Sequence, residues 1–501
     1  MIRWLLLALL AFAAPATASP RDWVNAHRAE ILREYLPLLA IPNVASNRAD
    51  IRRNADHIVE MMRRRGLSPR LLESEDGAAP PLIYGEWLVP GARRTLVIYA
   101  HYDGQPVTPS AWTVTPPFEP RLFAGPGRPV AIPADNAAIR DDWRLYGRST
   151  SDDKAGVMAI LSAVDALRAE GGRPAFNLKL VFEGEEEAGS PHLGALLRRH
   201  RALLGSDGWI IVDGPAHQSG PPQVALGVRG DVNLELTVYG PVRPLHSGHY
   251  GNWAPNPAMM LARLLASMKD ENGRVTIAGF YDDVVPLTEA ERRAIAAVPA
   301  PDAALRRELG LGWTEGSGAP LNALINLPSL NVNGMRSADV GANARNVIPA
   351  VATATLDLRL VLGNSPDRQI ERVRQHVRGQ GYEVLDHEPN MDERRHFRRI
   401  ARIEATAGYP AERTPLDHPL ASLVAAAMRR NGPFVLLPSL GGSLPLYVIH
   451  QELGASSVGL GLWNYDNNQH AEDENVRIGN LMDGIVAIAA VLQAGQPPDR
   501  R

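Results

Sequence analysis

The chain of 501 residues contains no cysteine, which excludes disulfide bonds and thiolate metal ligands. Its stability must therefore come from a buried core, and any metal must be bound through nitrogen and oxygen atoms. After the first residues, no apolar run reaches the roughly 18 residues that a membrane span requires. The formal net charge is only −3 and no basic block stands out, which disfavours nucleic acid or an anionic membrane as a partner. The sequence also lacks internal repeats and low-complexity segments.

The first 18 residues have the pattern of a secretory signal peptide. Arg3 precedes an apolar run, and Ala16-Thr17-Ala18 forms a small-x-small cleavage site. This pattern predicts cleavage near Ala18-Ser19 and a periplasmic or secreted location, with no membrane attachment after the signal is removed. A single arginine before the apolar run does not indicate twin-arginine export, and the absence of cysteine excludes a lipoprotein anchor.

The length of the chain exceeds what one hydrophobic core usually supports, so two domains are expected. In the first half, strand-like segments alternate with helical patterns, which predicts an α/β layer with a largely parallel sheet. The predicted strands are 95–99, 178–182 and 209–212, and the predicted helices are 154–168 and 193–204.

The pattern changes near Gly227 and returns near Thr414. Between these points, segments 231–239 and 352–360 alternate polar and apolar residues as half-exposed strands do, which favours a helix pair on one antiparallel sheet. A helix is expected at 257–269, and the α/β pattern resumes with helices at 418–430 and 481–492 and a strand at 456–462. The predicted fold is an α/β domain, a mixed sheet flanked by helices, over residues 19–227 and 409–501, with a smaller α+β domain inserted over 228–408.

Several acidic and histidine side chains follow predicted strands, where the carboxyl ends of an open α/β sheet line a ligand crevice. Asp152 instead precedes a helix, whose dipole favours a carboxylate. Three consecutive acids, Glu185 to Glu187, concentrate negative charge that a bound cation would offset. The residues that follow strands are His101, Glu186, Glu187, Asp213 and His470. Together these residue types predict a hydrolase site with two metal ions.

Each of these motifs has a simpler interpretation when it is taken alone. A single histidine after a strand, such as His101, is more often a hydrogen-bonded structural residue than a metal ligand. Asp152-Asp153 could be a helix N-cap with an acid in the first turn. The run Glu185 to Glu187 could be a solvated loop. The metal interpretation therefore depends on the ordered set rather than on one motif.

The ordered set resembles the di-zinc metallopeptidases typified by carnosinase, bacterial dipeptidases, aminoacylase and glutamate carboxypeptidase, and carnosine-type dipeptidases are the nearest subgroup. The matching segments occur in the order of that family and extend over nearly the whole mature chain. They are His101-Tyr-Asp103-Gly-Gln-Pro106, Gly147 to Lys154, Glu183 to Ser190, Val212-Asp213, Leu245-His246-Ser-Gly248, Gly441-Gly442-Ser443 and His470.

The resemblance implies two Zn²⁺ per subunit, although Mn²⁺ or Co²⁺ could occupy the same positions. It makes Asp152 the carboxylate that bridges both ions. It places His101 and Asp213 on one ion, and Glu187 and His470 on the other.

The catalytic roles that the resemblance implies belong to two acids. Glu186 would be the general base, and Asp103 would orient His101. Reading the acidic triplet one residue earlier would make Glu185 the base, but Ala188-Gly189-Ser190 favours the first register. The chain departs from the family pattern at Glu185, where many relatives have an apolar residue, and at Ala155-Gly156, where a glycine pair is usual.

The resemblance also implies residues that contact the substrate. His246 corresponds to a histidine that reaches the site from the smaller domain, in dimeric members from the neighbouring subunit, and hydrogen-bonds the oxyanion. Arg359 corresponds to an arginine that binds a substrate carboxylate. The backbone donors of Gly441, Gly442 and Ser443 would meet the same end of the substrate. Taken alone, these three motifs could be a loop histidine, a surface arginine and an ordinary turn.

A homodimer through the inserted domain is a further expectation, because the strand at 231–239 could pair edge to edge with its copy across a two-fold axis. The small peptide substrate would then be the other partner.

The resemblance implies a zinc-dependent metallopeptidase that hydrolyses the amide bond of dipeptides or short peptides, through a hydroxide held between the ions and a glutamate base. Asp213 favours an aminopeptidase or dipeptidase, since carboxypeptidases and deacylases of the family often have glutamate there. An N-acyl amino acid amidohydrolase with the same metal chemistry remains an alternative. A non-catalytic peptide-binding protein is another, but such a protein would have no need of Glu186.

Overall fold

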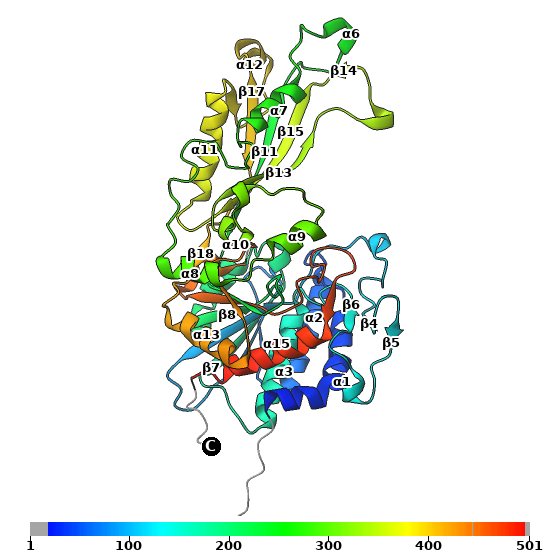
Figure 1. The fold of residues 1–501 in the computed structure, drawn as a ribbon, viewed down its shortest axis with the longest axis vertical. Coiled ribbons are helices and arrows are strands. Elements are labelled where there is room, and N and C mark those ends of the chain that lie inside the picture. The colour runs from blue at the N-terminus through cyan, green and yellow to red at the C-terminus, as the bar shows by residue number, and fades with distance from the viewer. Residues whose placement is uncertain (1–18, 443, 496–501) are drawn as a thin grey trace, which may run out of the picture.

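The computed structural model describes residues 19–442 and 444–495. The expected signal peptide, residues 1–18, and Ser443 lie outside the described residues. Figure 1 shows an elongated molecule, with a large α/β unit in its lower part and a smaller sheet in its upper part. Within the described ranges, no helix is both long enough and apolar enough to cross a membrane.

The large unit is built on an eight-stranded sheet of order β1-β2-β7-β3-β8-β20-β9-β19. The central neighbours β7, β3, β8 and β20 run parallel, whereas β1, β2 and β9 introduce antiparallel pairs, so the sheet is mixed as predicted. The strands are β1 (Arg70–Leu72), β2 (Leu82–Trp87), β3 (Thr95–His101), β7 (Asn177–Glu183), β8 (Gly208–Val212), β9 (Gln223–Ala225), β19 (Val435–Leu437) and β20 (Ser457–Gly461).

Both faces of this sheet are buried, which explains the nearly continuous apolar runs of its central strands. In β3, Leu96 and Ile98 belong to one hydrophobic core, while Val97 and Tyr99 belong to the core on the opposite face. The first core is closed by α1 (Pro20–Leu39), α2 (Arg48–Arg64), α3 (Lys154–Ala169), α13 (Pro419–Asn431) and α15 (Ile478–Leu492). The second is closed by α4 (Leu193–Arg199), α5 (Arg201–Leu204) and α14 (Leu446–Leu453).

The smaller sheet has the order β13-β15-β11-β17-β16 and its own hydrophobic core. The helix pair α7 (Pro257–Ala266) and α11 (Pro366–Gly379) contributes to that core. The sheet is not wholly antiparallel as expected, because β16 and β17 pair in parallel. Its strands are β11 (Gly230–Tyr239), β13 (Ser329–Arg336), β15 (Val351–Leu360), β16 (Glu383–Leu385) and β17 (Ile400–Ala405).

The prediction that strand 231–239 offers an edge for dimer pairing is wrong. β11 pairs with β15 along one side and with β17 along the other, so it lies in the middle of the sheet. Polar and apolar alternation indicates that one face of a strand is exposed, but it does not show which strands flank it. The edges of this sheet are instead β13 and β16.

The segment between β11 and β13 returns from the small sheet to the large unit. It contains α8 (Glu289–Ala297), α9 (Asp302–Glu308) and α10 (Leu321–Leu324). Glu291 forms a buried ion pair with Arg413 at 3.1 Å, and Val298 packs with Val435 and Leu437 of β19. Part of the expected inserted range therefore packs against the large sheet rather than within the small domain.

Candidate active site

The predicted metal ligands come from elements that end at one edge of the large sheet. His101 is the last residue of β3, Asp213 follows β8, and Glu187 lies in the short turn after β7. Asp152 lies just before α3, and His470 lies in the loop between β20 and β21 (Asn475–Arg477). Because β7, β3 and β8 are parallel neighbours, their carboxyl ends bring these side chains together.

Asp152 lies between the two histidines. Its Oδ1 is 3.0 Å from Nε2 of His101, and its Oδ2 is 3.0 Å from Nε2 of His470. The amide of Gln469 donates a further 3.0 Å hydrogen bond to Oδ2. The peptide bond between Asp152 and Asp153 is cis. The position of the Asp152 carboxylate between the two imidazoles is the one that a ligand shared by two ions would occupy.

Each imidazole also faces a second carboxylate. Oδ2 of Asp213 is 3.7 Å from Nε2 of His101, and Oε2 of Glu187 is 3.3 Å from Nε2 of His470. Ligand atoms of His101, Asp152 and Glu187 all lie within 4.8 Å of one another. The structure thus brings the five predicted ligands close together around Asp152.

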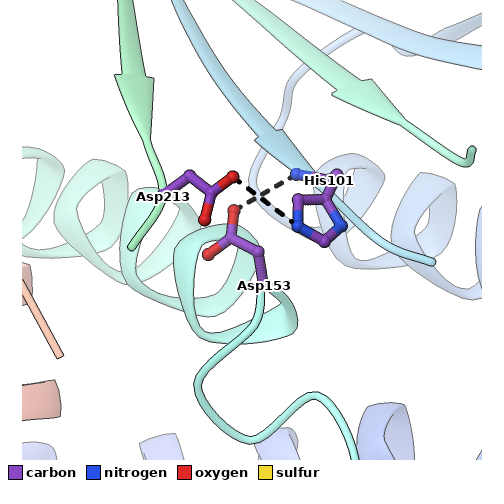
Figure 2. A group of neighbouring side chains, drawn as sticks. All are labelled: His101, Asp153 and Asp213. Atoms are coloured by element: carbon purple, nitrogen blue, oxygen red, sulfur yellow. Dashed lines mark hydrogen bonds and ion pairs between the residues drawn. The ribbon is translucent and has the colours of Figure 1, made fainter. Parts of the chain in front are cut away.

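Asp153 also lies close to His101 and Asp213, as Figure 2 shows, and their ligand atoms lie within 4.8 Å of one another. Its oxygens, however, accept hydrogen bonds from the backbone N–H groups of His101 at 3.2 Å and Gly156 at 3.1 Å. Asp153 is therefore the N-cap of α3, the simpler role considered for it from the sequence.

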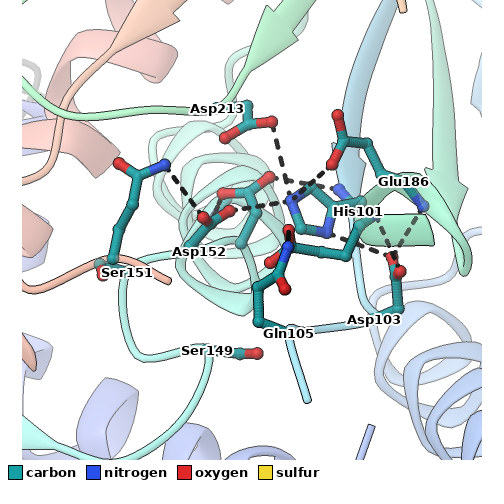
Figure 3. Close-up of polar contacts among 12 residues, drawn as sticks. His101, Asp103, Gln105, Ser149, Ser151, Asp152, Glu186 and Asp213 are labelled. Carbon is teal, nitrogen blue, oxygen red and sulfur yellow. Dashed lines mark hydrogen bonds and ion pairs between the residues drawn. The ribbon is translucent and has the colours of Figure 1, made fainter. Parts of the chain in front are cut away.

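The three consecutive acids point in different directions. Oε2 of Glu186 lies 3.9 Å from Nε2 of His101, and Figure 3 shows the side chain facing the cluster. The carboxylate of Glu185 instead accepts hydrogen bonds of 2.9 Å from the backbone N–H and from Nδ1 of His192. Of the two registers, this geometry favours the one with Glu186 as the base.

Asp103 connects the end of β3 to the turn that carries Glu186. Its two oxygens accept hydrogen bonds from the backbone N–H groups of Glu186 at 3.1 Å and Glu187 at 3.0 Å. Its Oδ1 also lies 3.3 Å from Nδ1 of His101. One buried carboxylate thus positions both the predicted base and a predicted ligand.

The pKa values in the cluster show that it concentrates negative charge away from water. Burial and the neighbouring Asp152 charge raise the pKa of Glu187 to about 8. Burial and the negative charge of Asp152 raise the pKa of Asp213 to about 7. The hydrogen bond to Asp152 raises the pKa of His470 to about 9. A divalent cation would offset this repulsion, and a set of imidazole nitrogens and carboxylate oxygens fits Zn²⁺.

A pocket of about 500 Å³ opens beside the cluster. Asp152, Glu186 and His470 line one part of it. Gly441 and Gly442, two of the residues expected to contact the substrate, line another.

Two other predicted substrate contacts lie elsewhere, and the described residues that line the pocket include neither of them. His246 is exposed at the end of β12 (Leu245–His246), beside α6 (Ser247–Tyr250) at the top of the small domain (Figure 1). Arg359 lies on β15, where its Nε is 3.1 Å from Oδ1 of Asp357. The roles assigned to these two residues stay predictions.

Several residues that hold the site together were not identified from the sequence. The Gln105 amide donates a 2.7 Å hydrogen bond to Glu187, and Gln469 holds Asp152 as described above. Glu474 accepts a hydrogen bond from the backbone N–H of Asp152 itself. Gln105 lies within the matching segment from His101 to Pro106, and Gln469 directly precedes His470, so both carried a signal in the sequence. Glu474 cannot be distinguished by sequence from the other acids of its loop.

A known protein family matches most of the chain. The model of the family described as "Peptidase family M20/M25/M40" matches residues 97–494. The "Cys-Gly metallodipeptidase DUG1" of Candida albicans is 24% identical over 492 residues, which cover 94% of this chain and 96% of that protein. The "Beta-Ala-His dipeptidase" of Homo sapiens is 26% identical over 419 residues, covering 82% and 76% of the two chains.

Among solved structures, the M20 family metallo-carboxypeptidase Sso-CP2 from Sulfolobus solfataricus has a TM-score of 0.74 and 28% identity. The match covers 92% of this chain and 98% of that one. It confirms the predicted fold class, an α/β unit with a smaller second domain.

Proposed function

The chain belongs to peptidase family M20/M25/M40, and from this premise we propose that it is a zinc-dependent dipeptidase that hydrolyses the amide bond of dipeptides or short peptides. The observation that carries the proposal is the position of Asp152 between His101 and His470, with Glu186 beside them. Relatives named as Cys-Gly and Beta-Ala-His dipeptidases support a dipeptide substrate.

Two cations would be held by the five predicted ligands. His101, Asp152 and Asp213 would bind one ion, and Asp152, Glu187 and His470 the other. When bound, the ions would acidify water and polarise the substrate carbonyl.

The protein's own residues position the reaction and move the proton. Glu186 takes a proton from the attacking water and delivers it to the nitrogen of the leaving amine. Asp103 holds the backbone of Glu186 in place for this transfer.

The wall of the pocket favours a substrate with an apolar side chain. The rings of Tyr409 and Tyr447 are stacked, with centroids 5.2 Å apart and planes 7° apart, and both residues line the pocket. Val448 and Leu444 extend this surface, and Ile325 adds to it from the segment after α10. An apolar side chain would be removed from water against this surface.

The alternative activity, hydrolysis of N-acyl amino acids, would use the same metal chemistry. It is not favoured, because the relatives are named as dipeptidases. The proposal of a non-catalytic peptide-binding protein is likewise disfavoured by the position of Glu186.

The deciding experiment is a substrate screen of zinc-loaded residues 19–501 against free dipeptides, N-acetylated amino acids and longer blocked peptides. We expect free dipeptides to be hydrolysed with the highest kcat/KM. Among them, dipeptides with apolar side chains should have a higher kcat/KM than glycyl-glycine. Preferred hydrolysis of N-acetylated amino acids would instead support the deacylase.

We further propose a homodimer through the small domain. β13 is an edge strand of the small sheet, and its Met335 is 61% exposed. Near His246 lies Trp253, which is 80% exposed. A two-fold interface here would cover these side chains and could bring His246 of one subunit toward the pocket of the other. Sedimentation analysis would test this, and a fully active monomer would contradict it.

Export from the cytoplasm is also a proposal, supported by the sequence pattern of residues 1–18. Cell fractionation and N-terminal sequencing of the mature protein would test it, with Ser19 as the expected first residue.

A further inference from the structure

Glu474 is a fully buried carboxylate that binds the segment before the predicted bridging residue Asp152. Its Oε1 accepts hydrogen bonds from Ser151 N at 2.9 Å, Ser151 Oγ at 2.8 Å and Asp152 N at 3.0 Å. Its Oε2 accepts hydrogen bonds of 2.9 Å from Ser149 N and from the Arg148 guanidinium. Both oxygens are thus fully occupied by donors of one short segment.

The main chain of Glu474 binds the same segment. Its carbonyl oxygen accepts a 3.0 Å hydrogen bond from Gly147 N, and the next residue, Asn475, pairs with Tyr146 across the β21–β6 ladder. β6 (Arg144–Tyr146) leads directly into the segment that ends at Asp152. The loop that carries His470 is therefore attached to the segment that carries Asp152 through both the side chain and the backbone of one residue.

We propose that Glu474 is a positioning residue for the metal centre, which fixes Asp152 and His470 at the separation needed to share two cations. This inference rests on the proposed function only in taking Asp152 and His470 as ligands. Glu474 is not among the described residues that line the pocket, and it acts through the backbone of residues 149–152.

The backbone on both sides of this contact adopts conformations that a free loop would avoid. Ser149 has φ 62° and His470 has φ 62°, in the left-handed region that non-glycine residues rarely occupy. Asp473, next to Glu474, also has positive φ, at 57°. Such conformations persist only where surrounding contacts enforce them. At Ser149, the hydrogen bond from its N–H to Glu474 is one of these contacts, beside the hydrogen bonds that Ser149 accepts from Tyr35 and Asn43.

A carboxylate is the group that this position requires, because all of its partners are donors. The neutral amide of Glu474→Gln would keep the shape but turn an N–H₂ group toward other N–H groups. It would also leave the buried Arg148 guanidinium without its charged partner. The loss of hydrogen bonds that hold a metal ligand in place typically lowers metal affinity 10- to 100-fold.

The test is a zinc titration of the metal-free protein by calorimetry and by competition with a chromogenic chelator. We expect Glu474→Gln to lose about 10- to 100-fold in zinc affinity, and Ser151→Ala, which removes one donor to Oε1, to show a smaller loss in the same direction. Excess zinc should restore much of the dipeptide turnover of Glu474→Gln with KM little changed. A residue that served stability alone would leave the affinity of the folded variant unchanged.

Asp473→Asn is the matched control. It removes one carboxylate charge from the same loop, but Asp473 binds the backbone of Thr113 and Val114, which hold no predicted ligand. We expect its zinc affinity to equal that of the wild type. An equal loss in Asp473→Asn would overturn the inference, as would wild-type affinity in folded Glu474→Gln. If Glu474→Gln does not fold, wild-type zinc affinity in Ser151→Ala would overturn the inference instead.

The outcomes also separate this inference from the proposed function. Wild-type protein that binds zinc but hydrolyses no dipeptide would overturn the proposed function and leave the role of Glu474 standing. Dipeptide hydrolysis by the wild type, together with unchanged zinc affinity in folded Glu474→Gln, would support the proposed function and overturn the role of Glu474.

Discussion

The hydroxyl of Tyr99 donates a 2.6 Å hydrogen bond to Oε2 of Glu183, and both residues are buried at the end of the central strands. Burial raises the pKa of Glu183 to about 8, although the hydrogen bond from Tyr99 opposes the shift. Glu183 is therefore neutral through much of the range in which most carboxyl groups are charged, and stability should depend on pH through this residue.

The sign of that dependence follows from the pKa difference. The pKa of Glu183 is about 8 in the folded protein, against an ordinary value of 4.5. Its stabilising contribution is thus complete below about pH 4.5 and is lost as the pH rises through about 8. Glu183→Gln stays neutral at every pH. We expect the melting temperature of the variant, relative to the wild type, to increase steadily between about pH 5 and about pH 9.

Melting curves of both proteins in the presence of a chelator would test this, since bound metal would add its own pH dependence. A difference in melting temperature that stays constant over this range would show that Glu183 is not protonated in the folded protein.

Replacement of Glu186 should separate catalysis from metal binding. Glu186→Gln removes the group that moves the proton, so we expect kcat to fall by about 10²- to 10⁴-fold. Zinc content, measured by atomic absorption, should remain that of the wild type. Glu185→Gln is the natural control, because that carboxylate faces His192. A larger loss of kcat in Glu185→Gln would assign the base to the other register.

Asp103→Asn should impair the site without removing a predicted ligand. The carboxylate accepts the N–H groups of Glu186 and Glu187 with separate oxygens, whereas an amide offers only one acceptor oxygen. We expect kcat or zinc affinity to fall by about 10- to 100-fold. Steady-state kinetics and zinc titration would measure the two effects, and wild-type values of both would remove Asp103 from the site.

The aromatic wall predicts a change in substrate preference. Tyr447→Ala would remove one of two stacked rings from the pocket, so apolar substrates should lose contact area. We expect kcat/KM for a leucine-containing dipeptide to fall roughly tenfold more than that for glycyl-glycine. Equal losses for the two substrates would indicate general damage rather than a lost contact.

The strands that carry the site could be predicted because their burial leaves a simple pattern. β3, β7 and β8 are apolar on both faces, and their observed ends lie within two residues of those predicted. His101 and Asp213 therefore fall at the expected edge of the sheet. The predicted helix at 193–204 was less accurate, because it is interrupted at His200 and forms α4 and α5.

Features that depend on distant contacts could not be predicted in this way. The position of β11 inside its sheet is set by β15 and β17, which follow it by more than 100 residues. The direction of Glu185 depends on His192, and α8 is held by the buried pair between Glu291 and Arg413. None of these relationships leaves a periodic signal in the local sequence.

The attachment of Glu474 to the segment before Asp152 spans 322 positions of the chain. During synthesis, His101, Asp152 and Asp213 leave the ribosome long before residues 470–474 do. The early segment alone lacks both His470 and the carboxylate that fixes Asp152. If the five predicted ligands hold two cations, binding of both would require this late loop, and a chain truncated before residue 470 would lack part of the site.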